Sequence, residues 1–398
     1  MPNPQAGKNH VAQLSQRRLN KLRMRILELG KFYPPYRGGM ETLLKSWAEG
    51  FVARGAGVEC VVANDRGRTQ VSNINGVSVR RLATFGQIWS VSVCPSYLWS
   101  TRLRGADVWH AHFPNPLADV AVLLGSAVTP LVLHYHSDVV RQAGLMWLYR
   151  PLLQGVLRRA TRIVVATPQH IDFSPWLPAW REKCRVIPFG IDRRPLELTP
   201  AVAAEVARLR AVAKGRAILL NIGRLVTYKG QRYLIEALRE LNAEAWFAGD
   251  GPLRADLERV ASEAGVAERV RFWGSVDERL LVSLLHACDL FVLPSTTSNE
   301  AFGLVQVEAM ACGKPVISCA LRSGVPFVNQ DQVTGLVVPP ADSTALASAI
   351  QELLCDDARR RSFGEAAKRR AQEEFDQTVM LDRYWALFQE VRTSTPVS

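Results

Sequence analysis

The sequence lacks the marks of a membrane-spanning protein, of a secreted protein and of a domain held by disulfides or zinc. Its longest apolar runs, such as AILLNI (217–222), fall well short of the about 20 residues that cross a bilayer. No apolar signal-peptide core precedes the first predicted strand. The seven cysteines are odd in number and never form a CxxC pair, which is typical of buried free thiols in a reducing compartment. We therefore expect a cytoplasmic protein.

The sequence has few acidic residues relative to basic ones, with 37 Asp and Glu residues against 49 Lys and Arg residues, and the net charge is +12. Such an excess suits nucleic acid, an anionic membrane surface or anionic substrates. The sequence contains no zinc finger, RNA-recognition signature or aromatic-rich basic ribbon, so we expect no nucleic-acid partner. The tail over residues 1–22 is polar and basic, and peripheral contact with the anionic inner face of a membrane stays open.

Strand patterns alternate with helix patterns in both halves of the chain, which is typical of parallel sheets with right-handed crossovers. At 398 residues the chain is too long for one ordinary core and suits two. We expect an α/β protein of two Rossmann-like, doubly wound domains that face a cleft. The strand runs of the first half are MRILELG (24–30), GVECVVA (57–63), ADVWHAHF (106–113), PLVLHYH (130–136), TRIVVATP (161–168) and CRVIPFG (184–190). Those of the second half are AILLNIGRL, AEAWFAGDG, VRFWGSV, DLFVLPST, KPVISCA and GLVVPP.

Three local signals refine this arrangement. The pair Asn75-Gly76 predicts a tight hairpin turn, because both residues tolerate positive φ angles. The segment RRPLELTPA (193–201) carries two prolines and no clear periodicity, so we interpret it as the linker between the halves. After Asp342 the chain is almost wholly helical to about Arg392.

In open α/β sheets a ligand lies outside the carboxyl ends of the strands, so residues that follow strands are the site candidates. After the first strand, Gly39 allows a close backbone approach to a ligand at the start of a helix, although a Gly-Gly pair is also a common turn. His136 ends the run PLVLHYH, and His112 lies at a similar strand end. Each histidine is either a site residue or a satisfied buried side chain.

In the second half, two cations flank one strand-to-helix turn. Arg224 follows the strand and Lys229 lies at the start of the helix. Surface cations are usually solvated, but two at this edge favour an anion site, and the combination suits a diphosphate. Gly249 gives a tight turn that we expect to form a wall of the pocket. Val276 ends the turn WGSV, where a nucleobase can meet backbone groups.

The stretch NEAFGLVQVEAMACGKP (299–315) places Glu300 in a loop and Glu308 about two turns into a helix that we expect to begin near Phe302. Free amides at a helix start bind phosphate without a metal. Glu300 suits sugar hydroxyls and Glu308 suits ribose hydroxyls. Alternatively, Glu300 caps the helix and Glu308 is solvated, but an idle carboxylate is costly in so apolar a helix. The amides expected at the helix start are those of Phe302, Gly303, Leu304 and Val305.

The run EAFGLVQVEAMACGKPVI resembles the E-x7-E signature of retaining glycosyltransferases of the GT-B fold, family four. GRLVTYKG resembles their diphosphate-binding turn, and GGMETLL, LHYHSD, AGDGP and FGID agree with that family in kind and order. The resemblance implies an acceptor domain at 23–192, a linker at 193–201 and a nucleotide-sugar domain at 202–376. It also implies that the last segment, 377–398, is a helix that returns to the first domain.

The resemblance further implies transfer of a hexose with retention of the anomeric configuration, without a metal or another cofactor. The absence of a DxD motif agrees with metal independence. LHYHSDVV resembles mannosyltransferases more than sucrose or glycogen enzymes, which favours mannose, with GDP-mannose and a UDP-sugar both open as donors. The expected acceptor is a glycan or a lipid-linked saccharide in polysaccharide or glycolipid biosynthesis.

Roles follow from the resemblance residue by residue. Arg224 and Lys229 neutralise the departing nucleoside diphosphate, Glu300 holds the donor sugar, and Glu308 binds the ribose. His136 lies over the sugar near the anomeric carbon.

Three further residues complete the set of candidates, of which Gly39 is assigned by the same resemblance. Gly39 lies against the diphosphate, and His112 and Tyr36 are candidates on the acceptor side.

Two other interpretations stay open. A GT-B epimerase that hydrolyses its own nucleotide-sugar would release nucleotide without any acceptor. A non-catalytic protein would use its basic face on nucleic acid or membrane, and the intact set Arg224, Lys229, Glu300 and Glu308 counts against it.

Overall fold

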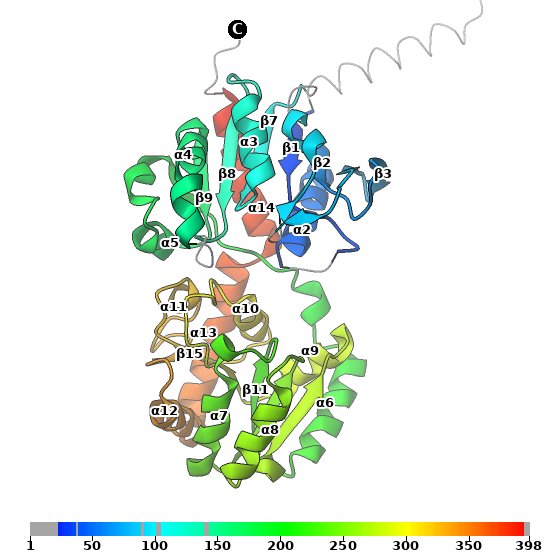
Figure 1. The fold of residues 1–398 in the computed structure, drawn as a ribbon. Coiled ribbons are helices and arrows are strands. Elements are labelled where there is room, and N and C mark those ends of the chain that lie inside the picture. The colour runs from blue at the N-terminus through cyan, green and yellow to red at the C-terminus, as the bar shows by residue number, and fades with distance from the viewer. Residues whose placement is uncertain (1–22, 37–38, 89–90, 101–104, 139–142, 394–398) are drawn as a thin grey trace, which may run out of the picture. The chain divides into compact units, whose positions relative to one another are not determined.

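The computed structural model describes residues 23–36, 39–88, 91–100, 105–138 and 143–393. Its contacts divide the chain into two compact units (Figure 1). The N-terminal unit comprises Met1–Val165, Ala179–Arg185 and Leu381–Ser398, and the C-terminal unit comprises Ala166–Pro178 and Val186–Met380.

This division differs from the boundaries expected at residues 192 and 376. Segments late in the first half contact the C-terminal unit, because the guanidinium of Arg322 lies 5.0 Å from the centre of the Phe173 ring and Phe189 packs edge-on against Phe302 at 5.1 Å. The final helix is divided after Met380.

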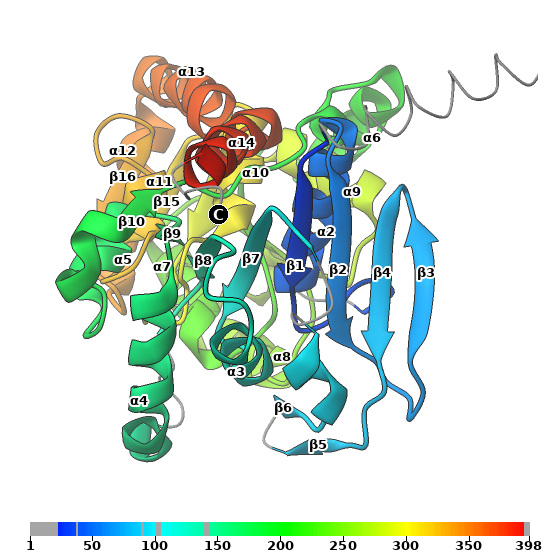
Figure 2. The ribbon, with the colours of Figure 1, turned by 90° about the horizontal axis from the view of Figure 1, so that it is seen from above.

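An eight-stranded sheet forms the core of the N-terminal unit, and Figure 2 shows its neighbouring strands side by side. The strand at its edge pairs antiparallel with its neighbour through the predicted hairpin, in which Asn75 and Gly76 have φ angles of 49° and 85°. The strand order is β10 (Cys184–Val186), β9 (Arg162–Val165), β8 (Leu131–Tyr135), β7 (Val108–Phe113), β1 (Arg25–Leu29), β2 (Gly57–Ala63), β4 (Val77–Leu82) and β3 (Gln70–Ile74). A separate two-stranded sheet consists of β5 (Gln87–Ile88) and β6 (Val91–Ser92).

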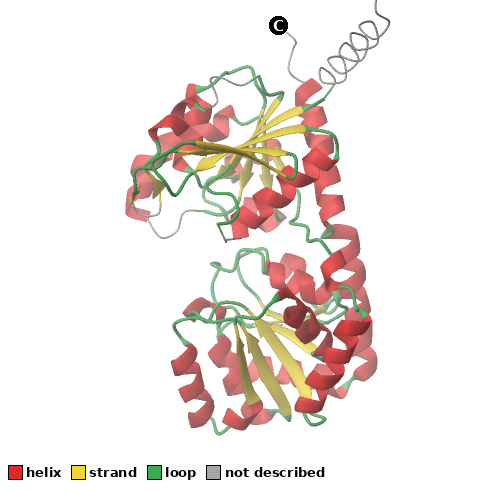
Figure 3. Cartoon of the chain, turned by 90° about the vertical axis from the view of Figure 1, so that its right-hand side faces the viewer, coloured by secondary structure: helices red, strands yellow, loops and turns green. Residues whose placement is uncertain are grey.

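Helices cover both faces of the sheets, as Figure 3 shows for each unit. This is why the central strands β7 and β8 are buried along their whole length and read as continuous apolar runs interrupted only by histidines. The helices of the N-terminal unit are α2 (Gly39–Ala53), α3 (Pro116–Leu124), α4 (Ala143–Arg159) and the part of α14 (Gln377–Thr393) that follows Met380.

The C-terminal helix α14 packs on the N-terminal unit from Leu381 onward, which confirms this part of the expected fold. Phe388 meets Phe51 of α2 with ring centres 5.1 Å apart. Asp382 accepts a hydrogen bond from Arg54 at 2.6 Å. The Tyr384 hydroxyl hydrogen-bonds to a ring nitrogen of His134. Apolar and polar contacts together therefore fix this helix to the unit.

A six-stranded parallel sheet forms the core of the C-terminal unit. Numbered along the chain, its strands have the order 3-2-1-4-5-6 of a dinucleotide-binding sheet. The strands are β13 (Val270–Gly274), β12 (Ala243–Ala248), β11 (Ala217–Ile222), β14 (Leu290–Leu293), β15 (Val316–Cys319) and β16 (Gly335–Val338). The helices are α5 (Pro168–Phe173), α6 (Pro200–Val212), α7 (Gln231–Ala237), α8 (Arg254–Glu263), α9 (Glu278–Ala287), α10 (Leu304–Ala311), α11 (Val325–Val328), α12 (Ser343–Cys355) and α13 (Asp357–Glu374).

Every strand run quoted from the sequence contains a strand, and the helical stretch after Asp342 is confirmed. The linker prediction is wrong at its end, because α6 begins at Pro200. Thr199 caps this helix by accepting a hydrogen bond from the Val202 N–H at 3.3 Å, and proline is favoured at the first helical position.

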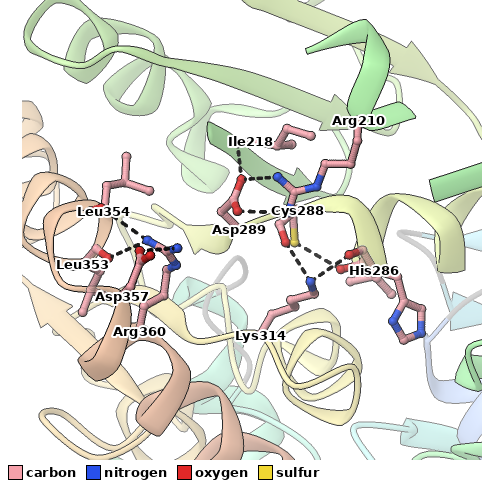
Figure 4. Close-up of polar contacts among 11 residues, drawn as sticks. Arg210, Ile218, His286, Cys288, Asp289, Lys314, Leu353, Leu354, Asp357 and Arg360 are labelled. Atoms are coloured by element: carbon pink, nitrogen blue, oxygen red, sulfur yellow. Dashed lines mark hydrogen bonds and ion pairs between the residues drawn. The ribbon is translucent and has the colours of Figure 1, made fainter. Parts of the chain in front are cut away.

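Two polar side chains join the elements around β14 (Figure 4). Asp289 accepts two hydrogen bonds from Arg210 at 2.8 and 2.9 Å and one from the Ile218 N–H at 2.8 Å. Lys314 donates to the carbonyl groups of His286 and Cys288, each at 2.8 Å, and so satisfies carbonyls at the end of α9. Lys314 therefore has a structural role.

None of the described helices is both long enough and apolar enough to traverse a bilayer. All seven cysteines lie in the described part of the chain, and none of them forms a disulfide there. Five of the seven are buried, as expected for free thiols.

Candidate active site

The sheet of the C-terminal unit reverses its strand order between β11 and β14, and ligands of open α/β sheets bind outside the carboxyl ends of strands at such a point. Arg224 and Lys229 follow β11, and Glu300 follows β14. The two loops are joined, because the Thr296 N–H donates to the Tyr228 carbonyl at 2.8 Å. The predicted residues of this unit therefore gather at the expected edge.

Lys229 and Glu300 form a buried ion pair. Nζ of Lys229 lies 2.6 Å from Oε2 of Glu300, and the two residues are only 9% and 8% exposed. The Ser295 hydroxyl donates to the same carboxylate oxygen at 2.9 Å. A buried carboxylate requires such charge and hydrogen-bond compensation. The structure thus brings together the two residues that the sequence assigned to the diphosphate and to the sugar.

Arg224 is held by its backbone and exposed at its side chain. Its carbonyl accepts a hydrogen bond from the Gln231 side chain at 3.1 Å. Within the described residues, its guanidinium has no hydrogen bond or ion pair. The side chain is therefore available to an anion at this turn.

Gly249 follows β12 in a backbone conformation with φ of 131°, which favours glycine. A Cβ atom there would lie 2.2 Å from the carbonyl oxygen of Gly223, so only glycine allows these two turns to touch. The Gly249 N–H also donates to the Gly274 carbonyl at 2.7 Å. Val276 follows this last turn and is half-buried. The turns after three neighbouring strands therefore form one continuous backbone wall.

The helix after β14 begins at Leu304 rather than near Phe302. Gly303 is its N-cap with φ of 70°, a left-handed conformation that ends the preceding loop abruptly. Phe302 is buried outside the helix, with its ring edge-on to Phe375 at 5.8 Å. The amide donors available at the helix start are therefore those of Leu304 and Val305, because the Gln306 N–H donates to the Gly303 carbonyl at 2.9 Å.

Glu308 is the fifth residue of α10, so it lies little more than one turn into the helix and not two turns as expected. Its carboxylate is half-buried and has no hydrogen bond or ion pair among the described residues. Burial raises the pKa of Glu308 to about 7. A carboxylate in this state accepts hydrogen bonds from ligand hydroxyls with little competition from protein donors.

The candidates around the start of α2 lie in the N-terminal unit. Gly39 is the first residue of α2, is exposed, and has open space where a Cβ atom would stand. Gly38 lies outside the described residues. Tyr36 is 37% exposed and stacks on Phe32 with ring centres 4.5 Å apart. Its acceptor-side role stays a prediction.

His136 and His112 are buried side by side in the N-terminal unit, 8% and 6% exposed. Nε2 of His136 lies 3.2 Å from Nδ1 of His112, and Nε2 of His112 lies 3.0 Å from Glu28. Both ring nitrogens of His112 thus contact side chains of the same unit. This arrangement favours a supporting role for His112 over the predicted contact with an acceptor.

Glu28 and His110 were missed by the sequence analysis. Nδ1 of His110 lies 3.0 and 2.9 Å from the two carboxylate oxygens of Glu28, and both residues are fully buried. The available signal was a glutamate inside the apolar strand RILEL, where an uncompensated charge would be costly.

Family models match both halves of the chain: "Glycosyl transferase 4-like domain" over residues 38–190 and "Glycosyl transferases group 1" over residues 207–370. The chain is 30% identical over 371 residues to the O-antigen chain mannosyltransferase C of Escherichia coli, covering 92% of this chain and 98% of that protein. The chain belongs to the group 1 glycosyltransferases.

Further relatives of this glycosyltransferase carry related names. It is 35% identical over 270 residues to the D-rhamnosyltransferase WbpZ of Pseudomonas aeruginosa, covering 68% of this chain and 70% of that protein. It is 30% identical over 297 residues to the phosphatidyl-myo-inositol mannosyltransferase of Mycobacterium leprae, covering 72% and 74%.

Solved structures of similar fold include Anabaena Alr3699/HepE in complex with UDP, at a TM-score of 0.75 and 22% identity, covering 92% of this chain and all of that chain. Another is the sucrose-phosphate synthase of Thermosynechococcus elongatus, at a TM-score of 0.73 and 23% identity, covering 94% and 100%. These similarities and the two parallel-sheet units confirm the GT-B fold of the glycosyltransferase.

The raised pKa of Glu308 predicts how its replacement by glutamine changes stability with pH. The folded-state pKa, about 7, exceeds the ordinary value of 4.5, so the fold favours the protonated form and loses stability as pH rises from 4.5 to 7. Glu308→Gln should therefore be close to wild type at pH 4.5 and more stable at pH 8, by at most about 3 kcal/mol at about 1.4 kcal/mol per pKa unit. Chemical denaturation at the two pH values measures this difference.

The matched control is Glu365→Gln, which changes an exposed carboxylate of the same unit. Its effect should be small and nearly the same at both pH values. Equal effects of Glu308→Gln at pH 4.5 and pH 8 would contradict a perturbed carboxyl group on α10.

Proposed function

We propose that this glycosyltransferase moves a hexose, with mannose favoured, from a nucleotide-diphospho-sugar to a glycan or a lipid-linked saccharide. We further propose that transfer retains the anomeric configuration and needs no metal. The observation that carries the donor class is the buried Lys229–Glu300 pair at the carboxyl ends of β11 and β14, just before the start of α10. A cation, a carboxylate and free helix amides suit a diphosphate joined to a hydroxyl-rich sugar.

The proposed chemistry depends on charge that develops on the leaving group. As the bond from the sugar to the diphosphate breaks, negative charge grows on the phosphate oxygen. Lys229 and Arg224 stabilise this charge, and the amides of Leu304 and Val305 add their dipoles. Because the interaction is stronger in the transition state than in the ground state, it raises turnover and not only affinity.

The remaining site residues are assigned to recognition of the donor. Glu300 accepts hydrogen bonds from sugar hydroxyls and Glu308 from ribose hydroxyls. His136 is assigned to the sugar near the anomeric carbon, as the resemblance implies. In the proposed retaining reaction, the acceptor hydroxyl attacks from the face that the leaving group departs from, and a phosphate oxygen takes its proton.

The names of relatives support the choice of sugar and acceptor. An O-antigen chain mannosyltransferase and a phosphatidyl-myo-inositol mannosyltransferase are among them, which favours mannose and an acceptor in polysaccharide or glycolipid biosynthesis. UDP is bound in a structure of similar fold, so UDP-sugars belong in the same test as GDP-mannose. The test incubates the enzyme with each donor and a lipid-linked saccharide, and the anomeric configuration of the product is read by NMR. Nucleotide release without an acceptor would favour the epimerase or hydrolase instead.

Replacing Lys229 or Arg224 by alanine should lower kcat by about 10² or more, because each removes a charge-assisted contact to the developing phosphate charge. Since both cations act on one charge, the double variant should be far from additive. Steady-state kinetics on protein checked by circular dichroism measures the effect. Near wild-type transfer by both single variants would refute the diphosphate site.

The matched control for Lys229 is Lys314→Ala. The ammonium group of Lys314 is half-buried and, like that of Lys229, has protein partners, but it caps carbonyls away from the site residues. Loss of Lys229 leaves Glu300 without its cation and should also lower stability. Lys314→Ala should lower stability while kcat stays near wild type. A loss of kcat that simply follows stability in both variants would contradict a role in catalysis.

Metal independence is a separate prediction. The two cations and the α10 amides supply the charge stabilisation that a divalent ion provides in other transferases. Activity should persist in EDTA at a concentration that removes divalent ions. Complete loss, restored by Mg²⁺ or Mn²⁺, would overturn this proposal.

The excess positive charge is confined to the N-terminal unit. By sequence, this unit holds 26 of the 49 Lys and Arg residues but only 11 of the 37 Asp and Glu residues. The C-terminal unit holds 23 and 26. We propose that the basic unit contacts an anionic membrane surface, where a lipid-linked acceptor is presented. Arg17, Arg18 and Lys21 of the tail lie outside the described residues.

Binding to vesicles that contain anionic lipid should be strong at low ionic strength and fall with added salt, because each basic residue near such a surface contributes about 1 kcal/mol within a Debye length. Deletion of residues 1–22 should weaken binding, and vesicles of neutral lipid serve as the control. Co-sedimentation measures the bound fraction. If the protein does not bind anionic vesicles at low salt, the proposed membrane contact of the basic unit is wrong.

A further inference from the structure

A buried polar cluster lies at the switch point of the N-terminal sheet, where strand order reverses between β1 and β7. Glu28 of β1 is directly opposite His110 of β7, and His112 of β7 is opposite His134 of β8. His136 follows β8. All five residues are at most 8% exposed, so the cluster lies in the interior of the unit.

Aromatic side chains of two helices cover the cluster. Trp47 of α2 stacks on the His112 ring at 5.1 Å and lies 5.0 Å from the His134 ring and 5.9 Å from the His136 ring. Tyr384 of α14 lies 5.2 Å from the His110 ring. These rings hold the histidines in place and exclude water from them.

A chain of hydrogen bonds runs through the cluster from Glu28 to His136. Nε2 of His112 lies 3.0 Å from Oε2 of Glu28. Nδ1 of the same ring lies 3.2 Å from Nε2 of His136. His112 therefore connects a fully buried carboxylate to the histidine at the strand end.

The charge states decide which atom donates in each bond. Burial would raise the pKa of Glu28, but the contacts with His110 and His112 outweigh it and hold the pKa below its ordinary value, so the group is an anion that only accepts. Burial, with His110 nearby, lowers the pKa of His112 to about 4, so this ring is neutral at pH 7. A neutral ring that donates from Nε2 to Glu28 has an unprotonated Nδ1. The bond between the two rings must then be donated by the Nε2–H of His136.

We propose that Glu28, acting through His112, fixes the tautomer and ring orientation of His136, with the Nε2–H of His136 donated to Nδ1 of His112. Glu28 and His112 are positioning residues, and His136 is the group that they set before a donor binds. A catalytic consequence rests on the proposed function, in which His136 contacts the sugar. Because such partners set the tautomer and orientation of the ring in advance, the ring does not have to reorient during the reaction.

The contacts favour hydrogen bonds over a metal ion, although Glu28, His110 and His112 could together hold one. Tetrahedral bonds of about 2.05 Å to a zinc ion place neighbouring ligand atoms about 3.3 Å apart. The carboxylate-to-imidazole distances here are 2.9 and 3.0 Å, the ordinary length of a charge-assisted hydrogen bond.

Among the described residues, the titratable groups in ring contact with His112 and His136 are His110 of the same strand, against His112, and His134 of β8, against His136. Tyr384 of α14 contacts His134. Lys31 and Glu41 line a pocket together with His112. His134 shares its Nδ1 with the Tyr384 hydroxyl. Trp47 of α2 does not titrate. A spectral change that accompanies a change of pH near neutrality must therefore be assigned to an individual histidine.

The direct test observes the seven histidines of the wild-type protein by two-bond ¹H–¹⁵N NMR, with assignment by single substitutions. At pH 7 His112 should be the neutral Nε2–H tautomer, and His136 should carry a proton on Nε2. A His112 ring protonated at Nδ1, or on both nitrogens, would overturn the proposal. Stoichiometric zinc bound to the purified protein would overturn it as well. This readout is made on the wild-type protein and does not depend on activity.

Two variants test the connection. In Glu28→Gln the anion that selects the tautomer is lost, and in His112→Phe both hydrogen bonds are lost while the ring that stacks on Trp47 is kept. Either change should convert the His136 signals to a mixture of tautomers. The control is Glu59→Gln on the neighbouring strand β2, which removes a carboxylate outside the cluster and should leave the His136 spectrum unchanged.

Kinetics then separates this inference from the proposed function. We expect both variants to lower kcat about tenfold, with the KM for the donor changed less than about threefold, and the double variant to be no worse than either single one. Additive losses, or an unchanged His136 spectrum in Glu28→Gln, would refute positioning through His112. If His136→Ala transfers sugar normally, the sugar contact in the proposed function is wrong, while the spectra still decide whether Glu28 sets the His136 ring.

Discussion

A parallel sheet covered on both faces has no place for an uncompensated charge, and this constraint decides where the polar side chains of the protein lie. Strands β7, β8 and β12 are buried along their whole length. Strand ends are the positions where a polar group can meet both the protein and a ligand. The site candidates of each unit accordingly gather where strand order reverses, between β1 and β7 in one sheet and between β11 and β14 in the other.

Three carboxylates show three different solutions to the cost of burial. Glu300 is neutralised by Lys229 at 2.6 Å, and Glu28 is compensated by two imidazoles. Glu308 has no protein partner among the described residues, and burial raises its pKa. The first two carboxylates are compensated by protein partners, whereas the third has none among the described residues, which agrees with the ribose contact proposed for it.

Most of the fold could be predicted from the sequence, because strand runs and amphipathic helices are local patterns. The Asn75-Gly76 hairpin and the strand that begins at Ala217 could each be predicted from residues that are neighbours in the sequence. The start of α10 was misplaced by two residues because Gly303 takes a left-handed conformation that periodicity does not reveal. The linker end was misplaced because Pro200 belongs to a capped helix start, and proline alone does not distinguish a loop from a first helical turn.

The candidate site was predictable where its residues are close in sequence and hidden where they are joined across strands. The turn at 224–229 and the pair Glu300 and Glu308 are local motifs. Glu28 and His112 are 84 positions apart, and only the pairing of β1 with β7 brings them within a hydrogen bond. A glutamate within an apolar strand indicates that a partner exists, but the sequence does not identify that partner.

The distribution of charge between the units shows why net charge is a weak guide to a binding site. The C-terminal unit has more acidic than basic residues, yet it contains the cations proposed to bind an anionic donor. Two positioned cations and a helix start suffice there, because interactions at hydrogen-bond distance in a half-buried site are much stronger than the screened field of distant surface charges. The overall charge of +12 therefore reflects the composition of the N-terminal unit and gives no indication of the proposed diphosphate site in the C-terminal unit.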